Sequence, residues 1–313
     1  MSDNNTPWER EVITQLAESS LKEQRRARRW GILFKLLTFA YIGGIIYLYG
    51  DASLTRVNLN EKHTALVELN GVIADKQEAS ADKIVTALRN AFDNEKSAGI
   101  ILRINSPGGS PVQSGYVYDE IVRLRKKHPD TPLYAVVTDI CASGGYYIAA
   151  AADKIYADKA SIVGSIGVRM DNFGFVDAID KLGIERRTLT AGEDKALLDP
   201  FLPVDEKTTA HIQNMLTEIH QQFINSVKEG RGDRLDTSVE GIFSGLIWTG
   251  EAAVKIGMVD ELASSSYVAR EVIGEETIIN YTVEEDLLQR FTERLGSTVA
   301  QAISTQFLSA TPR

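Results

Sequence analysis

Residues 99–110 read GIILRINSPGGS, an apolar run that passes directly into a glycine-rich turn. Gly99–Ile104 is short, apolar and bounded by turn residues, which predicts a buried strand. Gly108 and Gly109 let the backbone turn tightly with its N–H groups exposed, and a helix is predicted to follow at Val112–Lys127. Two interpretations stay open: an ordinary strand-to-helix turn, or amide donors for an anion or a developing oxyanion. The turn lacks the Lys-Ser/Thr ending of a P-loop, which disfavours phosphate binding.

A second strand-to-helix turn is predicted at residues 139–147, DICASGGYY, after a strand at Pro132–Val137. Ser143 would stand at the N-terminal end of a short helix, Tyr146–Ala152, where the helix dipole favours negative charge and so helps a nucleophile. The alternative is an ordinary N-cap serine. Cys141 is expected on the strand as a small packed residue. Neighbouring parallel strands end at one edge of a sheet, so the two turns together would supply donors and a hydroxyl for acyl transfer.

The rest of the chain repeats this alternation of strands and helices. Short apolar runs predict further strands, and helical spacing predicts further helices. This rhythm predicts an α/β fold with a parallel sheet and crossover helices. After Asp171 the pattern is mostly helical. The helix predicted at Asp205–Glu229 carries an apolar stripe, as do the residues near the C-terminus, and such a stripe packs either on its own subunit or on a neighbour. The further strands are Thr64–Leu69, Ile155–Tyr156 and Ile162–Val168, and the further helices are Ala81–Glu95 and Asp205–Glu229.

The N-terminal part carries an apolar run, Trp30–Tyr49, that reads WGILFKLLTFAYIGGIIYLY with Lys35 as its only charge. About 20 such residues suffice to cross a bilayer, which predicts one membrane span. Basic residues crowd positions 22–29, so the N-terminus is predicted to be cytoplasmic and the rest of the chain to lie outside. The alternatives are a buried core helix and a cleaved signal peptide.

Composition excludes several classes of function. The 313 residues carry a formal net charge of −9, which argues against a nucleic-acid binder. A single cysteine excludes an internal disulfide framework and a cysteine-based zinc site. None of the four histidines is well placed as a base, and they form no cluster, so neither a metal nor another cofactor is expected. A lysine is the alternative base if desolvation lowers its pKa, but spacing alone does not choose among the lysines.

Five stretches resemble, in order, the bacterial signal peptide peptidase family of the SppA type in its short, single-repeat form. The NSPGG turn also recurs in Clp-type proteases and is only moderately specific. The set of Ser-Gly-Gly-Tyr, Gly-Ser-Ile-Gly and Lys-x4-Pro-Phe is highly specific. The matching stretches are LRINSPGGSP at 102–111, ASGGYYIAAAADKIYA at 142–157, VGSIGV at 163–168, AGEDKALLDPF at 191–201 and GLIWTGEAAVKIGMVDEL at 245–262.

This resemblance implies a role for each matched residue. It implies Ser143 as the nucleophile and Lys195 as the general base of a Ser/Lys dyad, with Ser165 orienting the lysine amine. It also implies a Clp/crotonase-like fold and no cofactor. The glycines implied for the oxyanion hole are Gly108 or Gly109, together with Gly144.

The resemblance further implies an inner-membrane serine endopeptidase whose protease domain is periplasmic. Its substrates would be hydrophobic peptides, notably cleaved signal peptides, and neighbouring subunits of a ring-shaped homo-oligomer would share active sites. The alternatives are a related SohB-type membrane protease, a non-catalytic membrane scaffold and an acyl-CoA enzyme of the crotonase fold. The predicted organisation is a cytoplasmic tail at 1–29, a transmembrane signal anchor at 30–49, a linker at 50–62, the protease domain at 63–280 and an amphipathic helix at 281–313.

Overall fold

The computed structural model describes residues 7–50 and 61–283. The chain divides into two compact units, residues 1–58 and 59–313. Most of the C-terminal amphipathic helix predicted at 281–313 lies outside the described residues. Each unit is described by itself below.

The first unit contains one continuous helix, α1, at Pro7–Gly50. Along the described part of the chain, no helix is long and apolar enough to cross a membrane. This finding corrects the span predicted for residues 30–49. The predicted run continues a helix whose preceding turns are densely charged, and Lys35, Thr38 and the glycines within the run dilute its apolar side chains.

The second unit is built on an eight-stranded sheet in the order β6-β5-β3-β2-β1-β8, with β4 pairing with β3 and β7 pairing with β4. Every pair is parallel except β5 with β6. This confirms the predicted α/β fold with a mostly parallel sheet. The strands are β1 His63–Asn70, β2 Ser97–Ser106, β3 Leu133–Ala142, β4 Lys154–Ala157, β5 Ile162–Gly164, β6 Ile247–Thr249, β7 Glu261–Leu262 and β8 Ile278–Asn280.

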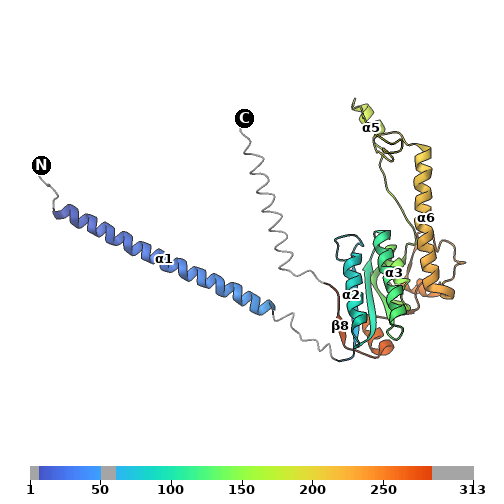
Figure 1. The fold of residues 1–313 in the computed structure, drawn as a ribbon, viewed down its shortest axis with the longest axis horizontal. Coiled ribbons are helices and arrows are strands. Elements are labelled where there is room, and N and C mark those ends of the chain that lie inside the picture. The colour runs from blue at the N-terminus through green and yellow to red at the C-terminus, as the bar shows by residue number, and fades with distance from the viewer. Residues whose placement is uncertain (1–6, 51–60, 284–313) are drawn as a thin grey trace. The chain divides into compact units, whose positions relative to one another are not determined.

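Helices cover both faces of the sheet, which is why its central strands carry consecutive buried apolar residues. Ile100, Leu102 and Ile104 of β2 face the main core beneath α2 and α3, whereas Ile101 packs in a smaller cluster on the other face. Figure 1 shows α2 and α3 lying side by side against the sheet. The helices are α2 Ala81–Asp93, α3 Pro111–Lys127, α4 Gly144–Ala149, α5 Val176–Lys181, α6 Glu206–Arg231, α7 Gly250–Lys255 and α8 Ser265–Tyr267, with a 3-10 turn at Gly232–Arg234 and a π-helical turn at Val268–Ile273.

The predicted strands and helices up to β5 are present, but the prediction for the later part needs correction. After Asp171 the chain was expected to be mostly helical, yet α5 is the only helix between β5 and α6, and three short strands follow α6. His63, which precedes the predicted strand Thr64–Leu69, is the buried first residue of β1. The short strands β6, β7 and β8 lack a clear alternation of apolar and polar residues, because pairing with neighbouring strands, rather than a pattern in their own few residues, makes them strands.

One long segment of the second unit contributes nothing to its core. No residue from Gly167 to Gln222 is buried, and we call this segment the arm. Its last part is the outer portion of α6, whose 26 residues correspond to about 39 Å of helix. Figure 1 shows α5 at the end of α6 that is remote from the sheet. Of the apolar stripe predicted on this helix, only Phe223 and Val227 are buried in this chain.

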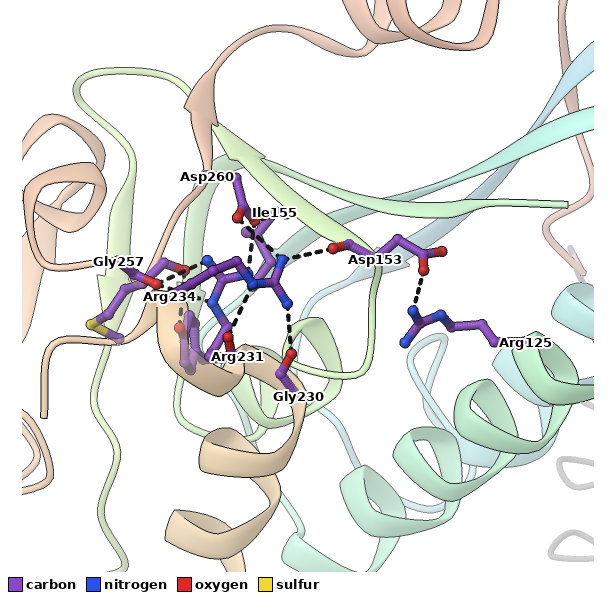
Figure 2. A network of polar contacts seen from close by, with 10 residues as sticks. Arg125, Asp153, Ile155, Gly230, Arg231, Arg234, Gly257 and Asp260 are labelled. Carbon is purple, nitrogen blue, oxygen red and sulfur yellow. Dashed lines mark hydrogen bonds and ion pairs between the residues drawn. The ribbon is translucent and has the colours of Figure 1, made fainter. Parts of the chain in front are cut away.

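A network of arginines and aspartates holds the inner end of α6 on the sheet (Figure 2). The buried Arg231 donates to Asp260 at 2.7 Å and to the carbonyl oxygen of Gly257 at 2.8 Å. Arg234 also donates to Asp260, at 3.2 Å, and Asp260 accepts the Ile155 amide at 2.7 Å. The direction in which the arm leaves the sheet therefore depends on these contacts.

Candidate active site

The site lies where β2, β3 and β5 end together. Ser106 of β2 pairs with Cys141 of β3, and Ala142 pairs with Gly164 of β5. The turns that follow these three strands therefore meet at one edge of the sheet. This confirms the expectation that the two glycine-rich turns are neighbours.

Ser143 has an unusual backbone for a non-glycine residue, with φ 51° and ψ −123° at the junction of β3 and α4. Its amide donates to the Gly164 carbonyl oxygen at 2.8 Å. Its side chain makes no capping hydrogen bond to α4, so the hydroxyl does not act as an ordinary N-cap. Among the described residues, the hydroxyl has no hydrogen-bond partner, and it is partly exposed at the sheet edge. A serine on such a sharp strand-to-helix turn presents its hydroxyl as nucleophilic serines do.

Cys141 is excluded as a competing nucleophile. It is fully buried on β3, as predicted, and burial raises the pKa of its thiol. The thiol therefore stays protonated and packed in the core.

The glycine turn after β2 touches the turn of Ser143 directly. A Cβ on Gly108 would lie 2.7 Å from the Gly144 nitrogen and 2.7 Å from the Ser143 Cβ, so only glycine fits there. The Gly108 amide donates to the Ser106 Oγ at 3.1 Å and is therefore already occupied. Within the described residues, the amides of Gly109 and Gly144 have no recorded acceptor. Of the two glycines that the sequence left open, the geometry favours Gly109, which is exposed whereas Gly108 is buried.

Ser165 stands on the third turn, beside Ser143. It too has a left-handed backbone, with φ 56°, and its amide donates to the Leu246 carbonyl oxygen at 2.7 Å. The preceding residue, Gly164, is the one that accepts the Ser143 amide. The structure therefore brings together Ser143, Ser165 and the three candidate oxyanion glycines.

Lys195 is not brought to this cluster. It is exposed on the arm, and its neighbours Glu193 and Asp194 lie 3.6 and 3.8 Å from Lys207 at the outer end of α6. Farther along α6, towards the sheet, His220 contacts the turn of Ser165: its Nε2 lies 3.1 Å from the Ile166 carbonyl oxygen. Lys207 and His220 are separated by about 20 Å along the helix. Within one chain, the lysine is therefore remote from Ser143.

Comparisons with known proteins identify the family of this chain. Residues 125–277 match the family model described as "Peptidase family S49". A protein of Methanocaldococcus jannaschii named "Putative protease MJ0651" is 31% identical over 257 residues, which cover 80% of this chain and 81% of that protein. The chain belongs to peptidase family S49.

Two further relatives have different names and lengths. An Enterococcus faecium protein named "Putative signal peptide peptidase SppA" is 30% identical over 250 residues, covering 76% of this chain and 72% of that protein. A Brucella abortus protein named "Na(+)/H(+) antiporter NhaA" is 42% identical over 189 residues, which cover 60% of this chain. That match spans only 25% of the Brucella protein.

As a member of family S49, the protein is a serine peptidase that hydrolyses peptide bonds. The family assignment favours a peptidase over the non-catalytic scaffold and the acyl-CoA enzyme. Within the described residues, no group of three or more His, Cys, Asp or Glu side chains could hold a metal. His63 hydrogen-bonds Tyr281 at 2.9 Å inside the fold, and His220 is held against the Ile166 carbonyl. Sequence reasoning did not anticipate that His220 contacts the turn of Ser165, because its helix carries no motif.

Proposed function

We propose that this peptidase uses a Ser/Lys dyad assembled from two subunits and cleaves hydrophobic peptides, including signal peptides released by preprotein processing. One observation carries the proposal. The Ser143 hydroxyl stands beside the Gly109 and Gly144 amides, which have no acceptor among the described residues, while Lys195 stands on an exposed arm far from it in the same chain. A second copy of the chain is the simplest source of the missing base.

The proposed chemistry follows the general course of serine acyl transfer. The neighbour's Lys195 amine accepts the Ser143 proton as Oγ attacks the scissile carbonyl carbon. The oxyanion that forms accepts hydrogen bonds from the Gly109 and Gly144 amides. The protonated Lys195 then gives its proton to the leaving amine. The neutral Lys195 amine next deprotonates a water molecule, which hydrolyses the acyl-enzyme. Ser165 would hold the lysine amine in line with Ser143.

The arm supports assembly into a closed ring. Its large apolar side chains are exposed to an extent that a monomer in water would rarely keep, with Leu189 100% and Val204 82% exposed. A head-to-tail contact that inserts each arm beside the next subunit's site would bury them. Such contacts form a ring when the rotation closes.

The surface around the site supports an apolar substrate. Val72, Val112 and Tyr116 are exposed near the turn that carries Gly108 and Gly109. The similarity to the Enterococcus protein supports signal peptides as one class of substrate, and the order of sheet and helices supports the finer Clp/crotonase-like assignment. A periplasmic location for residues 61–283 stays a prediction. An alkaline phosphatase fused after residue 283 would be inactive if that prediction is wrong.

The decisive experiment mixes two inactive variants, Ser143→Ala and Lys195→Ala, under conditions that allow subunits to exchange. If neighbours share sites, some interfaces pair an intact serine with an intact lysine, and cleavage of a fluorogenic apolar peptide returns. The double variant should be no less active than either single one, because residues that act as a unit are not additive. Activity that stays at background after proven exchange would contradict the shared dyad. A Ser165→Ala variant should lose less activity than either dyad variant.

A serine-directed fluorophosphonate probe tests the nucleophile separately. We expect it to label the wild-type chain and to leave Ser143→Ala unlabelled. Labelling that persists at full strength in Ser143→Ala would assign the nucleophile to another residue. Cleavage of apolar and polar peptides of matched length then tests the proposed substrate class, and equal rates on both would contradict it.

A further inference from the structure

Ser106, at the end of β2, has a fully buried hydroxyl that the chemistry above does not use. Its Oγ donates to the Gly71 carbonyl oxygen at 2.7 Å and accepts the Gly108 amide at 3.1 Å. One hydroxyl therefore joins the turn after β1 to the turn after β2. The Gly108 amide is buried, so losing this acceptor would leave it without a partner.

Both ends of Gly108 are fixed. Its amide is held by Ser106, and its carbonyl oxygen accepts the Ile73 amide at 2.9 Å. The Ile73 carbonyl oxygen in turn accepts the Ser110 amide at 2.8 Å. These bonds hold Gly108 at φ 98°, a conformation that a side chain would strain.

The direction of the Gly109 amide follows from this arrangement. A trans peptide is planar, so the N–H of Gly109 points opposite to the C=O of Gly108. Because that C=O points at Ile73, the Gly109 N–H points away from Ile73. Gly144 lies close to this nitrogen: a Cβ on Gly144 would be 3.3 Å from the Gly109 nitrogen. The two amides without acceptors are thus neighbours.

We propose that Ser106 is a positioning residue for the oxyanion hole. By occupying the Gly108 amide, it fixes one side of Gly108 while the Ile73 amide fixes the other, and the two bonds together set the following peptide, which presents the Gly109 N–H beside that of Gly144. This inference rests on the proposed function, since it needs Ser143 to form an oxyanion intermediate. Without the hydroxyl, the peptide that carries the Gly108 amide would rotate to find another acceptor, and the Gly109 donor would move with it.

The test compares Ser106→Ala with a matched control, Ser161→Ala. Ser161 is also buried, and its hydroxyl likewise donates to a carbonyl, that of Thr138, and accepts an amide, that of Asp158 at 3.0 Å. It contacts neither Gly108 nor Gly109. Ser106→Ala should lower kcat by about 10- to 100-fold with KM changed less than about 2-fold, as expected for a displaced oxyanion donor. Ser161→Ala should keep kcat within about 2-fold.

A transition-state analogue provides a measurement that a purely structural role would not affect. A peptide boronic acid forms a tetrahedral adduct with the serine, so its inhibition constant should rise in Ser106→Ala by the factor by which kcat/KM falls. If Ser106→Ala does not fold, Ser106→Cys under reducing conditions serves instead. Its shape is similar, but its thiol is a weaker hydrogen-bond partner, so kcat should again fall more than KM changes.

The outcomes separate the two proposals. If Ser143→Ala still cleaves peptide, the proposed function is wrong. If Ser143→Ala is inactive but a folded Ser106 variant keeps the wild-type kcat and boronate affinity, only the positioning role is wrong. An equal loss of kcat in Ser161→Ala would also overturn it, because the effect would then follow from burial alone.

Discussion

At the scale of single residues, the site depends on backbone conformations that side chains rarely adopt. Ser143 and Ser165 both have positive φ, although neither is a glycine. Such conformations cost on the order of 1–3 kcal/mol each and persist where the surrounding structure enforces them. Around Ser143 the enforcing contacts are the bond of its amide to Gly164 and the close approach of Gly108. The backbone conformation of Ser143, the proposed nucleophile, therefore lowers the stability of the fold.

This strain can be measured by comparing two inactive variants. Ser143→Gly and Ser143→Ala both lack the hydroxyl, but only glycine tolerates φ 51° and ψ −123° without strain. The flexibility of glycine in the unfolded chain offsets about 0.5–1 kcal/mol of the relief. We expect Ser143→Gly to be more stable than Ser143→Ala by about 1 kcal/mol in urea unfolding. A less stable glycine variant would show that the turn is not strained.

The sequence predicted that the two glycine-rich turns lie side by side, but it did not predict which of their amides are hydrogen-bonded. The sequence alone did not distinguish Gly108 from Gly109 as an oxyanion donor. Which of the two amides is free depends on hydrogen bonds made by Ser106 and Ile73. Lys195 was named only through resemblance. Lys195 lies on an exposed arm because α6 extends away from the sheet, and the residues around Lys195 do not indicate this direction.

At the scale of elements, α6 is held on the sheet by charged groups rather than by a broad apolar face. The Arg231 side chain is fully buried, and its partner Asp260 is nearly so. Burial raises the pKa of Asp260. Hydrogen bonds from Arg231 and the Ile155 amide, together with the charges of Arg231 and Arg234, lower the pKa by more than burial raises it, so it lies below its ordinary value. The carboxylate stays charged and keeps the arginine paired (Figure 2).

Removing this carboxylate should loosen α6 from the sheet. Asp260→Ala leaves a buried guanidinium without its charged partner, and we expect a loss of about 3–5 kcal/mol in the free energy of unfolding. Glu185→Ala is the control, because its pair with Arg187 is exposed and should contribute less than about 1 kcal/mol. Urea denaturation of both variants measures the difference. Equal losses would show that burial of Arg231 does not matter.

A second charged cluster joins α2 to α3 and makes stability depend on pH. Hydrogen bonds from Arg123, opposed by burial and helped by Arg89, lower the pKa of Glu120 to about 2. Its contribution is fully present above the ordinary glutamate pKa, near 4.5, and is lost as the pH falls towards 2. Both arginines are half exposed, so solvent screening limits the contribution to about 1–2 kcal/mol.

Glu120→Gln tests this pH dependence. At pH 7 the variant should be less stable than the wild type by about 1–2 kcal/mol, and the two should converge near pH 2. The difference between the two proteins isolates Glu120 from other acids that titrate in the same range. Urea unfolding across this range is the measurement, and a difference that is constant with pH would assign the effect to packing.

Sequence patterns predicted the longer helices and strands, whose apolar residues are buried at regular positions along the element itself. The centre of β2, Ile100–Leu102, is apolar at every position because both faces of the strand are covered, and α2 has a regular apolar stripe that packs on the sheet. β6, β7 and β8 have two or three residues each, so their pairing with distant strands decides that they are strands at all. The apolar residues of the arm before α6 are exposed and do not predict its structure, and the regular stripe of α6 is buried by the described residues only at Phe223 and Val227.

At the scale of the whole molecule, the second unit has a packed core and an arm that lacks one. Phe173 and Leu182 are each 73% exposed on the arm, besides Leu189 and Val204. Several large apolar side chains exposed on one segment are typical of a surface that another molecule covers. The same segment carries Lys195, the proposed base, which lies far from Ser143 of its own chain. Assembly and catalysis should therefore depend on the same residues.

This dependence gives a prediction that separates assembly from folding. Leu189→Asp and Val204→Asp introduce charge where a monomer exposes the side chain almost entirely, so the free energy of unfolding should change by less than about 0.5 kcal/mol. In a ring the same charge would be buried at an interface, which is costly without a partner. We therefore expect these variants to lose both the assembled state and peptide cleavage. The matched control is Asn90→Asp, which adds one charge on the exposed face of α2, away from the arm.

Sedimentation velocity and peptide cleavage, measured on the same samples, decide the outcome. The control should sediment and cleave as the wild type does, and the arm variants should sediment as smaller species with cleavage at background. Because the arm variants keep an intact Ser143 and Lys195, their inactivity would come from separation of the two residues. Adding Ser143→Ala subunits, whose arms are unaltered, should then restore some cleavage, since an intact lysine can reach an intact serine again. An arm variant that sediments as a monomer and cleaves at the wild-type rate would show that each chain completes its own site.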